Sequence, residues 1–445
     1  MRPLDHKIWG IAWPAILSNI SIPLLGLVDA AILGHLGTTT YLGAVAIGGA
    51  ILSFLYWGFN FLRMGTTGLV ARAEGAGDSD GSLLILAQSA VLAIALALLV
   101  WLAHPLWLGI GIALMAPQDE LLPLASSYAS IRIISAPAVL LTYAVVGWFI
   151  GRQNTRWPMF IVVATNVCNI ALDFLFIIGL GLQSDGAAMA TVIAEYLGLG
   201  LAVYGVVVSV PRQRATGFYR KLRSWPAYKA LLRSNRHLFV RTVCLLGSFA
   251  FFTAMGDKLG GDTLAANALM LQLLMLTSYA MDGFAFAAEG LSGNALGGRD
   301  LAGFQAATSR CALWCAVAAS VMSLAFLLLH QPLFSLLTNL PSVRTIMLQH
   351  SAWLILLPLV AAPSYLLDGV FIGSAETRPM MLTMMFSALG IYLPVWYLTQ
   401  AWGNNGLWLA FTLFNATRGI TLFFYYQHFN RRGYWLRQAA ATQKA

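Results

Sequence analysis

Long apolar runs alternate with short polar interruptions from one end of the chain to the other. Most of these runs are about 20 residues long, which is the length that an α-helix needs to cross the hydrocarbon core of a bilayer. None of them shows the strict alternation of a half-buried strand. The pattern therefore predicts about twelve membrane-spanning helices. We expect them near residues 7–34, 41–63, 83–103, 121–150, 157–181, 185–209, 237–256, 262–288, 303–329, 345–374, 379–401 and 404–428.

One polar interruption is much longer than the others and divides the spans into two sets of six. It covers residues 211–236 and is rich in Arg and Lys. We interpret it as a basic cytoplasmic linker between an N-terminal lobe, residues 1–210, and a C-terminal lobe, residues 237–430. Residues 431–445 form a cytoplasmic tail in this interpretation. The expected fold class is an all-α polytopic membrane protein with two pseudo-symmetric six-helix lobes.

A motif in the first half of the chain returns in the second half with the same internal spacing. Both copies read Tyr-x3-Gly-x-Phe-Ile-Gly-x3-Thr-Arg, over residues 143–156 and 365–378. The repeat indicates that one half-molecule was duplicated. Internal repeats of this kind are typical of membrane transporters.

The composition agrees with a membrane protein and excludes several other classes. Hydrophobic residues make up 59% of the chain and charged residues 10%, whereas soluble domains have about 25% charged residues. Basic residues gather at alternate interruptions, and the opposite side receives only Lys258 and Arg344. Since short cytoplasmic loops retain Lys and Arg, both termini are predicted to lie in the cytoplasm. The net charge of +9 then reflects topology and contact with anionic membrane lipids, and we expect no nucleic-acid partner.

Ionisable residues inside a bilayer cost about 2.5–3.5 kcal/mol each on insertion scales, so each one is a candidate functional residue. Counted along their spans, Asp29, Asp173 and Thr191 lie roughly 8–12 Å below the outer surface, at 1.5 Å per residue. Asn169 precedes Asp173 by four residues and shares its helix face. We predict an outward-opening polar pocket from these four, with Tyr128 and Asn166 as further contacts.

Two carboxyl groups in such a pocket would not both stay charged without a cation between them. The pocket therefore suits either H⁺ or Na⁺ as a coupling ion. The alternative interpretation is that Asn169 and Asp173 only join neighbouring helices.

Other intramembrane ionisable residues are candidates for more than one role. Glu195, one turn beyond Thr191, is a candidate relay or a structural residue. Asp368 is a further candidate relay or substrate contact, with Arg378 as its expected ion-pair partner. Asp282 and Glu289, near the cytoplasmic end of the eighth span, are candidates for the same roles or for a structural or gating role in which Arg310 or basic residues of the loops neutralise them. Two intramembrane arginines also need partners, namely Arg132 and Arg418.

The six-span halves, the paired motif and the stretch Asp29–Gly37 resemble the MATE multidrug exporters, and the run Asp282–Glu289 resembles the DinF-type branch of that family. The resemblance implies a V-shaped pair of lobes that works by alternating access. It also implies export of organic cations and hydrophobic drugs against entry of H⁺ or Na⁺.

The cation residues of the family fall on Asp29, Asn169, Asp173 and Thr191. Pro14 matches a proline of the family's first helix, where it either bends the helix during transport or makes an ordinary kink. One branch of the family has a Na⁺-site glutamate in the seventh span. Since the only acidic residue of that region here is Asp257, at its end, the resemblance favours H⁺.

The principal alternative is a lipid or oligosaccharide-lipid flippase of the same superfamily, which would need basic residues in its cavity. The cavity candidates here are acidic, polar, aromatic or Met, which suits bulky cations better. An enzyme is not expected, because the seven histidines lie at span ends or in loops. We therefore expect no cofactor, and no bound metal apart from the coupling ion. We expect small-molecule substrates, a monomeric protein and a location in a bacterial inner membrane.

Overall fold

The computed structural model describes residues 3–34, 40–115, 119–210 and 221–435. Every regular element within these ranges is a helix, and twelve helices are long and apolar enough to cross a membrane. The predicted all-α polytopic class and the predicted number of spans are therefore confirmed. Residues 35–37 of the stretch Asp29–Gly37, residues 211–220 of the predicted linker and residues 436–445 of the predicted tail lie outside the described ranges.

The helices of the first half are α1 (Pro3–Gly34), α2 (Thr40–Gly58), α3 (Phe61–Gly75), α4 (Ser79–Leu102), α5 (His104–Met115), α6 (Leu122–Arg132), α7 (Ala136–Gly151), α8 (Arg156–Asp173) and α9 (Gln183–Ser209). Those of the second half are α11 (Trp225–Lys258), α12 (Gly261–Gly297), α13 (Leu301–Leu337), α14 (Pro341–Gln349), α15 (Ser351–Gly373), α16 (Thr377–Met385), α17 (Leu393–Thr399) and α18 (Asn404–Arg431). Short 3₁₀ or π turns join α6 to α7 and α16 to α17, so each pair forms one span.

Several boundaries differ from the sequence prediction, and the second, eighth and ninth spans continue to Gly75, Gly297 and Leu337. Helix α11 begins at Trp225, so the second part of the predicted linker is helical. The span predicted at 345–374 is two helices, α14 and α15, that meet at His350. The predicted loop 104–120 contains α5, which has 12 residues and is too short to cross a bilayer. Apolar length identifies the part of a helix in lipid, and it misses polar helical turns and short interfacial helices.

The chain divides into two compact units. The first-half unit contains Leu17–Val70 and Ser79–Leu232, and the second-half unit contains Met1–Ile16, Ala71–Asp78 and Arg233–Ala445. Two segments of the first half of the sequence thus belong to the second-half unit. They are the beginning of α1 and the end of α3 with the turn that follows it.

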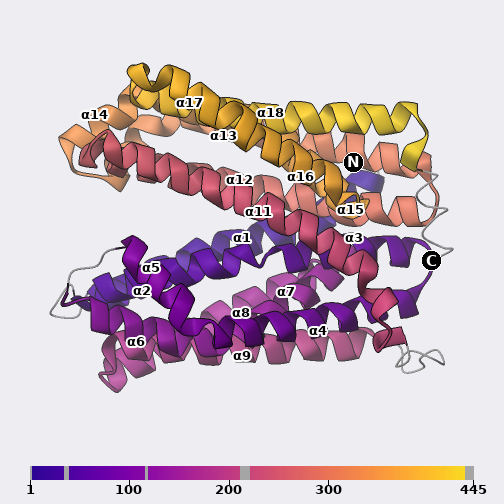
Figure 1. Cartoon of the computed structure of the whole chain (residues 1–445), viewed down its shortest axis with the longest axis horizontal. Coiled ribbons are helices and arrows are strands. Elements are labelled where there is room, and N and C mark those ends of the chain that lie inside the picture. The colour runs from indigo at the N-terminus through magenta and orange to yellow at the C-terminus, as the bar shows by residue number, and fades with distance from the viewer. Residues whose placement is uncertain (1–2, 35–39, 116–118, 211–220, 436–445) are drawn as a thin grey trace. The chain divides into compact units, whose positions relative to one another are not determined.

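Within each unit, both consecutive and alternate spans pack against one another. In the first-half unit α8 and α6 both pack against α9, and α4 packs against α7. In the second-half unit α12 packs against α13 and α15, and α15 packs against α18 (Figure 1). An aromatic core that includes Phe252, Trp408 and Phe411 fills the second-half unit.

The first glycine of the repeated motif allows a close approach of two helix backbones in both units. A Cβ on Gly147 of α7 would overlap the backbone carbonyl of Arg63 on α3, and a Cβ on Gly369 of α15 would overlap that of Ala285 on α12. Small residues let the backbones of membrane helices approach closely. The motif therefore marks a close helix crossing that occurs once in each half.

One carboxyl group outside the spans is poised to titrate near neutral pH. Glu376 lies in the turn between α15 and α16, where Arg72 donates to the carbonyl of Ser374 at 3.3 Å. Burial raises the pKa of Glu376 to about 7, against the opposing effects of the charge on Arg72 and of a long hydrogen bond, 3.5 Å, from the hydroxyl of Tyr434.

We expect the free energy of unfolding to decrease as the pH rises, because of the ionisation of Glu376. The folded protein holds the proton on Glu376 up to a pKa of about 7, whereas the ordinary value is 4.5. Between these two values the folded state binds more protons than the unfolded state. Raising the pH through this range therefore lowers the free energy of unfolding by up to about 3 kcal/mol, and the decrease is complete above pH 7. The Glu376→Gln variant should show a higher melting temperature than the wild type at pH 8 and a similar one at pH 5, measured on protein in detergent. A difference of equal size at both pH values would contradict this.

Candidate functional site

Two carboxyl groups from different helices face each other in the first-half unit. Asp29 lies near the end of α1, and Asp173 is the last residue of α8. Their side chains lie within hydrogen-bonding reach of each other, and Asp173 is 1% exposed. A π-helical turn, Phe174–Gly179, begins directly after Asp173. Such turns are frequent at functional sites.

Two polar side chains of α8 and α9 complete this group. In the amide orientation that satisfies all partners, Asn169 donates to Oδ2 of Asp173 at 2.7 Å. Its amide oxygen accepts from the hydroxyl of Thr191 at 2.9 Å and from the backbone N–H of Thr191 at 3.2 Å. Asp29, Asn169, Asp173 and Thr191 are thus brought together as their depths along the spans predict. We call these four residues the carboxyl-pair cluster. Their role in coupling stays a prediction.

The hydrogen bonds of the cluster are incomplete. Oδ1 of Asp29 and Oδ1 of Asp173 are buried and have no hydrogen-bond partner among the residues that the structure describes. A buried carboxylate oxygen without a donor is costly. Two such oxygens on facing carboxyl groups are suited to a proton or to a hard cation such as Na⁺. Within the described ranges there is no group of three or more His, Cys, Asp or Glu side chains arranged to hold a metal ion.

Three further predicted residues of this unit lie around the cluster without joining it. Glu195 forms an ion pair with Arg132 at 3.1 Å, which supplies the partner that this intramembrane arginine needs. Arg132 also donates to the hydroxyl of Tyr128 at 3.3 Å. Asn166 donates to the hydroxyl of Ser21 at 3.1 Å. Asn166 therefore connects α8 to α1 at Ser21, about two helical turns before Asp29. This amide group hydrogen-bonds Ser21 and not the carboxyl pair.

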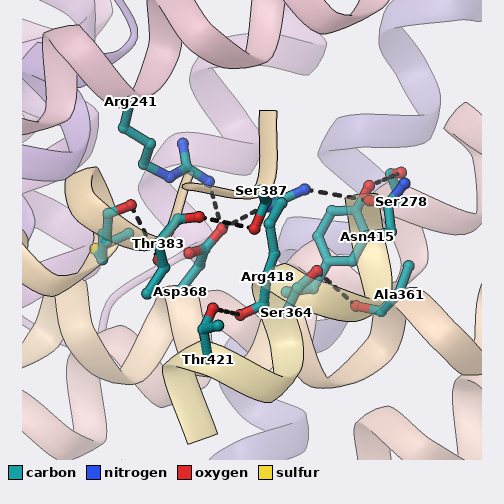
Figure 2. A network of polar contacts seen from close by, with 12 residues as sticks. Arg241, Ser278, Ala361, Ser364, Asp368, Thr383, Ser387, Asn415, Arg418 and Thr421 are labelled. Carbon is teal, nitrogen blue, oxygen red and sulfur yellow. Dashed lines mark hydrogen bonds and ion pairs between the residues drawn. The ribbon is translucent and has the colours of Figure 1, made fainter. Parts of the chain in front are cut away.

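The remaining predicted carboxylates belong to the second-half unit. Asp368 of α15 forms ion pairs with Arg241 of α11 and with Arg418 of α18, the latter at 2.9 Å. Figure 2 shows the three side chains converging, with Asn415 accepting from Arg418 at 3.2 Å. We call Arg241, Asp368 and Arg418 the buried triad, because each is at most 7% exposed.

The expected pairing of Asp368 with Arg378 is wrong. Helix α15 ends at Gly373, and Arg378 lies on the next helix, where it is exposed. The triad also contains one residue that the sequence reasoning did not single out. Arg241 lies inside the predicted span 237–256, so the rule that intramembrane charges need partners would have found it.

Asp282 and Glu289 both lie on α12, seven residues apart. Glu289 is 2% exposed, in a segment where the backbone of α12 closely approaches Gly373. Asp282 is partly buried, and its charge acts on Tyr279 and Tyr365. Their proposed roles as relay or substrate contacts stay predictions.

Comparison with known proteins decides the family. The MatE family profile matches residues 14–175 and 238–398, one segment in each half of the chain. The chain belongs to the MATE family. This MATE transporter is 37% identical over 432 residues to DNA damage-inducible protein F of Escherichia coli, covering 97% of this chain and 94% of that protein. The predicted DinF-type resemblance is therefore confirmed, and the relatives are transporters and not enzymes.

More distant relatives agree with this assignment. A probable multidrug resistance protein NorM of Acinetobacter baylyi is 26% identical over 195 residues, 43% of each chain. A crystal structure of a MATE protein in a bent conformation superposes with a TM-score of 0.87 at 20% identity, covering 98% of this chain and 97% of that one. At this identity the superposition supports the fold. The family and the twelve spans together make this a multi-pass membrane protein of the bacterial inner-membrane type.

Proposed function

We propose that this MATE transporter is a secondary active exporter. It takes up a cation, H⁺ in preference to Na⁺, at the carboxyl-pair cluster and exports organic cations and hydrophobic drugs by alternating access. The observation that carries the proposal is the pair of facing carboxyl groups, Asp29 and Asp173, with one unpartnered oxygen each. The multidrug resistance named for the NorM relative supports the substrate class.

The chemistry of the pair fits an antiporter. When the cation is bound, the two carboxyl groups carry less negative charge and can stay together in a low-dielectric site. When it leaves, two buried carboxylates repel each other and favour a different arrangement of α1 and α8. A substrate that prefers one arrangement is thereby linked to the cation, because each ligand shifts the equilibrium that the other uses.

The preference for H⁺ over Na⁺ rests on the acidic residues of α11 in the second-half unit. Helix α11 contains one acidic residue, Asp257, next to its last residue, Lys258. The Na⁺-site glutamate that one branch of the family has in this span is therefore not reproduced inside α11. The incomplete hydrogen bonding of the carboxyl-pair cluster alone suits either ion.

The decisive experiment uses purified protein in liposomes loaded with a fluorescent cationic dye. A pH gradient and a Na⁺ gradient are imposed separately, with Asp29→Asn alongside. Efflux that follows the pH gradient and is lost in the variant supports a proton-coupled exporter. Efflux that follows only the Na⁺ gradient keeps the exporter and makes the pair a sodium site. No efflux under either gradient would favour the lipid flippase, which a lipid-scrambling assay on the same liposomes would then test.

Helix α1 is a candidate coupling element, because its two parts are held by different units. Asp5 makes a bidentate ion pair with Arg310 of α13, at 3.0 and 2.6 Å. Beyond Ile16 the helix belongs to the first-half unit, where Asp29 faces Asp173. The change of unit occurs next to Pro14, which cannot donate to the carbonyl four residues before it.

We expect Pro14→Ala to slow transport more than it weakens substrate binding. Alanine restores the missing backbone hydrogen bond and stiffens the point where α1 passes between the units. Turnover in liposomes should fall several-fold, while the dissociation constant of the dye, measured by fluorescence on protein in detergent, stays within about twofold. An unchanged turnover would make the proline an ordinary kink. Pro23→Ala, in the same helix and beyond the change of unit, is the matched control.

A further inference from the structure

The α-helical hydrogen bonding of the span formed by α6 and α7 is interrupted near its middle. Side chains of two other helices donate hydrogen bonds to the backbone at this interruption. A 3₁₀ turn, Ile133–Ser135, separates the two helices. One carbonyl of this turn accepts from the indole of Trp101 at 2.8 Å, and the next accepts from the hydroxyl of Tyr196 at 2.9 Å. A 3₁₀ stretch within a helix often marks a functional hinge. Arg132 is the last residue of α6, directly before this turn.

The guanidinium of Arg132 is only partly paired. One nitrogen binds Glu195 of α9 at 3.1 Å and a second binds Tyr128 at 3.3 Å. Its Nε is buried without a hydrogen-bond partner among the described residues, and so is Oε2 of Glu195. The Arg132 and Glu195 side chains are 14% and 19% exposed. An ion pair with one unpartnered atom on each side can rearrange.

The carboxyl-pair cluster lies within electrostatic range of the same guanidinium. The charge of Arg132 acts on both Asp29 and Asp173. Glu195, which forms the ion pair with Arg132, lies one turn after Thr191 of the cluster on the same face of α9. Among the described residues, the other ionisable groups that interact electrostatically with Arg132 or Glu195 are tyrosines of the same or neighbouring helices, namely Tyr56, Tyr128, Tyr143 and Tyr196. One further basic residue, Arg63, acts on Tyr143.

We propose that Arg132 is the counter-ion of the carboxyl pair when the pair is ionised. Glu195 is the alternative ion-pair partner of Arg132 when the pair is not. With the coupling cation bound between Asp29 and Asp173, Arg132 pairs with Glu195. When the cation leaves, the guanidinium pairs with the carboxylates that have become charged. Arg132 is then a positioning residue that competes with the coupling cation, and Glu195 sets how strongly it competes. This inference rests on the proposed coupling role of the carboxyl pair.

The competition gives the two residues opposite effects on the cation. Without Arg132 nothing replaces the departing cation, so the carboxyl pair should hold it more tightly. Without Glu195 the guanidinium is free to remain on the carboxyl pair, so the cation should bind more weakly. A merely structural ion pair would give the same effect for both removals, namely a loss of stability.

The test measures gradient-driven dye efflux from liposomes as a function of pH. We expect the pH of half-maximal rate to move by about one unit to alkaline values in Arg132→Gln and by about one unit to acidic values in Glu195→Gln. Each shift is a tenfold change in proton affinity. The Arg132→Gln/Glu195→Gln variant should behave like Arg132→Gln, because Glu195 acts only through the arginine. Arg132→Lys, which keeps the charge, should stay near the wild-type midpoint.

Asp185→Asn is the matched control, because Asp185 of α9 accepts from Ser127 of α6 at 2.9 Å and so joins the same two helices away from the arginine. If Na⁺ drives efflux, the Na⁺ concentration of half-maximal rate replaces the pH midpoint. If Arg132→Gln does not fold, the double variant, which removes both charges together, still carries the test.

The outcomes separate this inference from the proposed function. Normal efflux by Asp29→Asn would overturn the coupling role of the carboxyl pair itself. Loss of efflux in Asp29→Asn together with unmoved midpoints in Arg132→Gln and Glu195→Gln would overturn only the counter-ion role. Loss of efflux in Glu195→Gln that the added Arg132→Gln does not relieve would make Glu195 a relay residue instead.

Discussion

Asp29→Asn and Asp173→Asn should each reduce gradient-driven export to the rate of protein-free liposomes while leaving the protein folded. Asparagine keeps the shape of the side chain and can still hydrogen-bond, but it cannot hold a proton or supply a negative charge. The remaining carboxyl group then has no like-charged neighbour, so the electrostatic difference between the loaded and the empty pair disappears. Dye efflux under the gradient that drives the wild type is the measurement.

The same variants should not be destabilised. Each replacement removes one of two carboxyl groups that face each other in a buried site, and like charges at this distance are unfavourable. The melting temperature in detergent should therefore equal or exceed that of the wild type, most clearly at alkaline pH. Asp185→Asn serves again as the control for efflux, since its carboxylate lies on α9 and contacts Ser127. Wild-type efflux by both Asp29→Asn and Asp173→Asn would remove the carboxyl pair from the mechanism.

The membrane fold was predictable because the bilayer fixes the length of a span. Apolar runs of about 20 residues located all twelve crossings, and the structure confirms that number. Depth along the spans brought Asp29, Asp173 and Thr191 to one level, and the spacing of four residues placed Asn169 beside Asp173. These four residues meet in the structure.

Pairings between helices were not predictable in the same way. The partner of Arg132 is Glu195, and the partners of Asp368 are Arg241 and Arg418. Which side chains meet depends on how each helix is rotated about its axis, and one sequence does not give that rotation. The nearest basic residue along the chain was therefore a poor guide to the partner of Asp368.

The repeated motif was visible in the sequence, but its physical meaning was not. Spacing alone shows that Gly147 and Gly369 correspond. The structure adds that both stand where a side chain would meet the backbone of another helix. The duplicated halves thus share a packing requirement. They do not share the ionisable residues, since the carboxyl pair is in one unit and the buried triad in the other.

Asp368→Asn should destabilise the protein by about 3–5 kcal/mol, the usual cost of breaking a buried ion pair by removing one partner. The replacement leaves the guanidinium groups of Arg241 and Arg418 buried together, at 5% and 4% exposure, without a negative charge between them. The melting temperature in detergent should fall strongly. Asp300→Asn is the control, because Asp300 is an exposed residue at the start of α13 and asparagine caps helices equally well.

A variant without any of the three charges distinguishes a structural triad from a functional one. Arg241→Met/Asp368→Leu/Arg418→Met removes the buried charges together, which is often neutral for stability or favourable. If it recovers both the melting temperature and dye efflux, Asp368 stabilises the second-half unit and carries no proton or substrate. If the melting temperature returns while efflux stays lost, Asp368 has the relay or substrate role that its intramembrane position suggests. An unchanged melting temperature in Asp368→Asn alone would mean that the two arginines find other partners, and the triad would then not hold α11, α15 and α18 together.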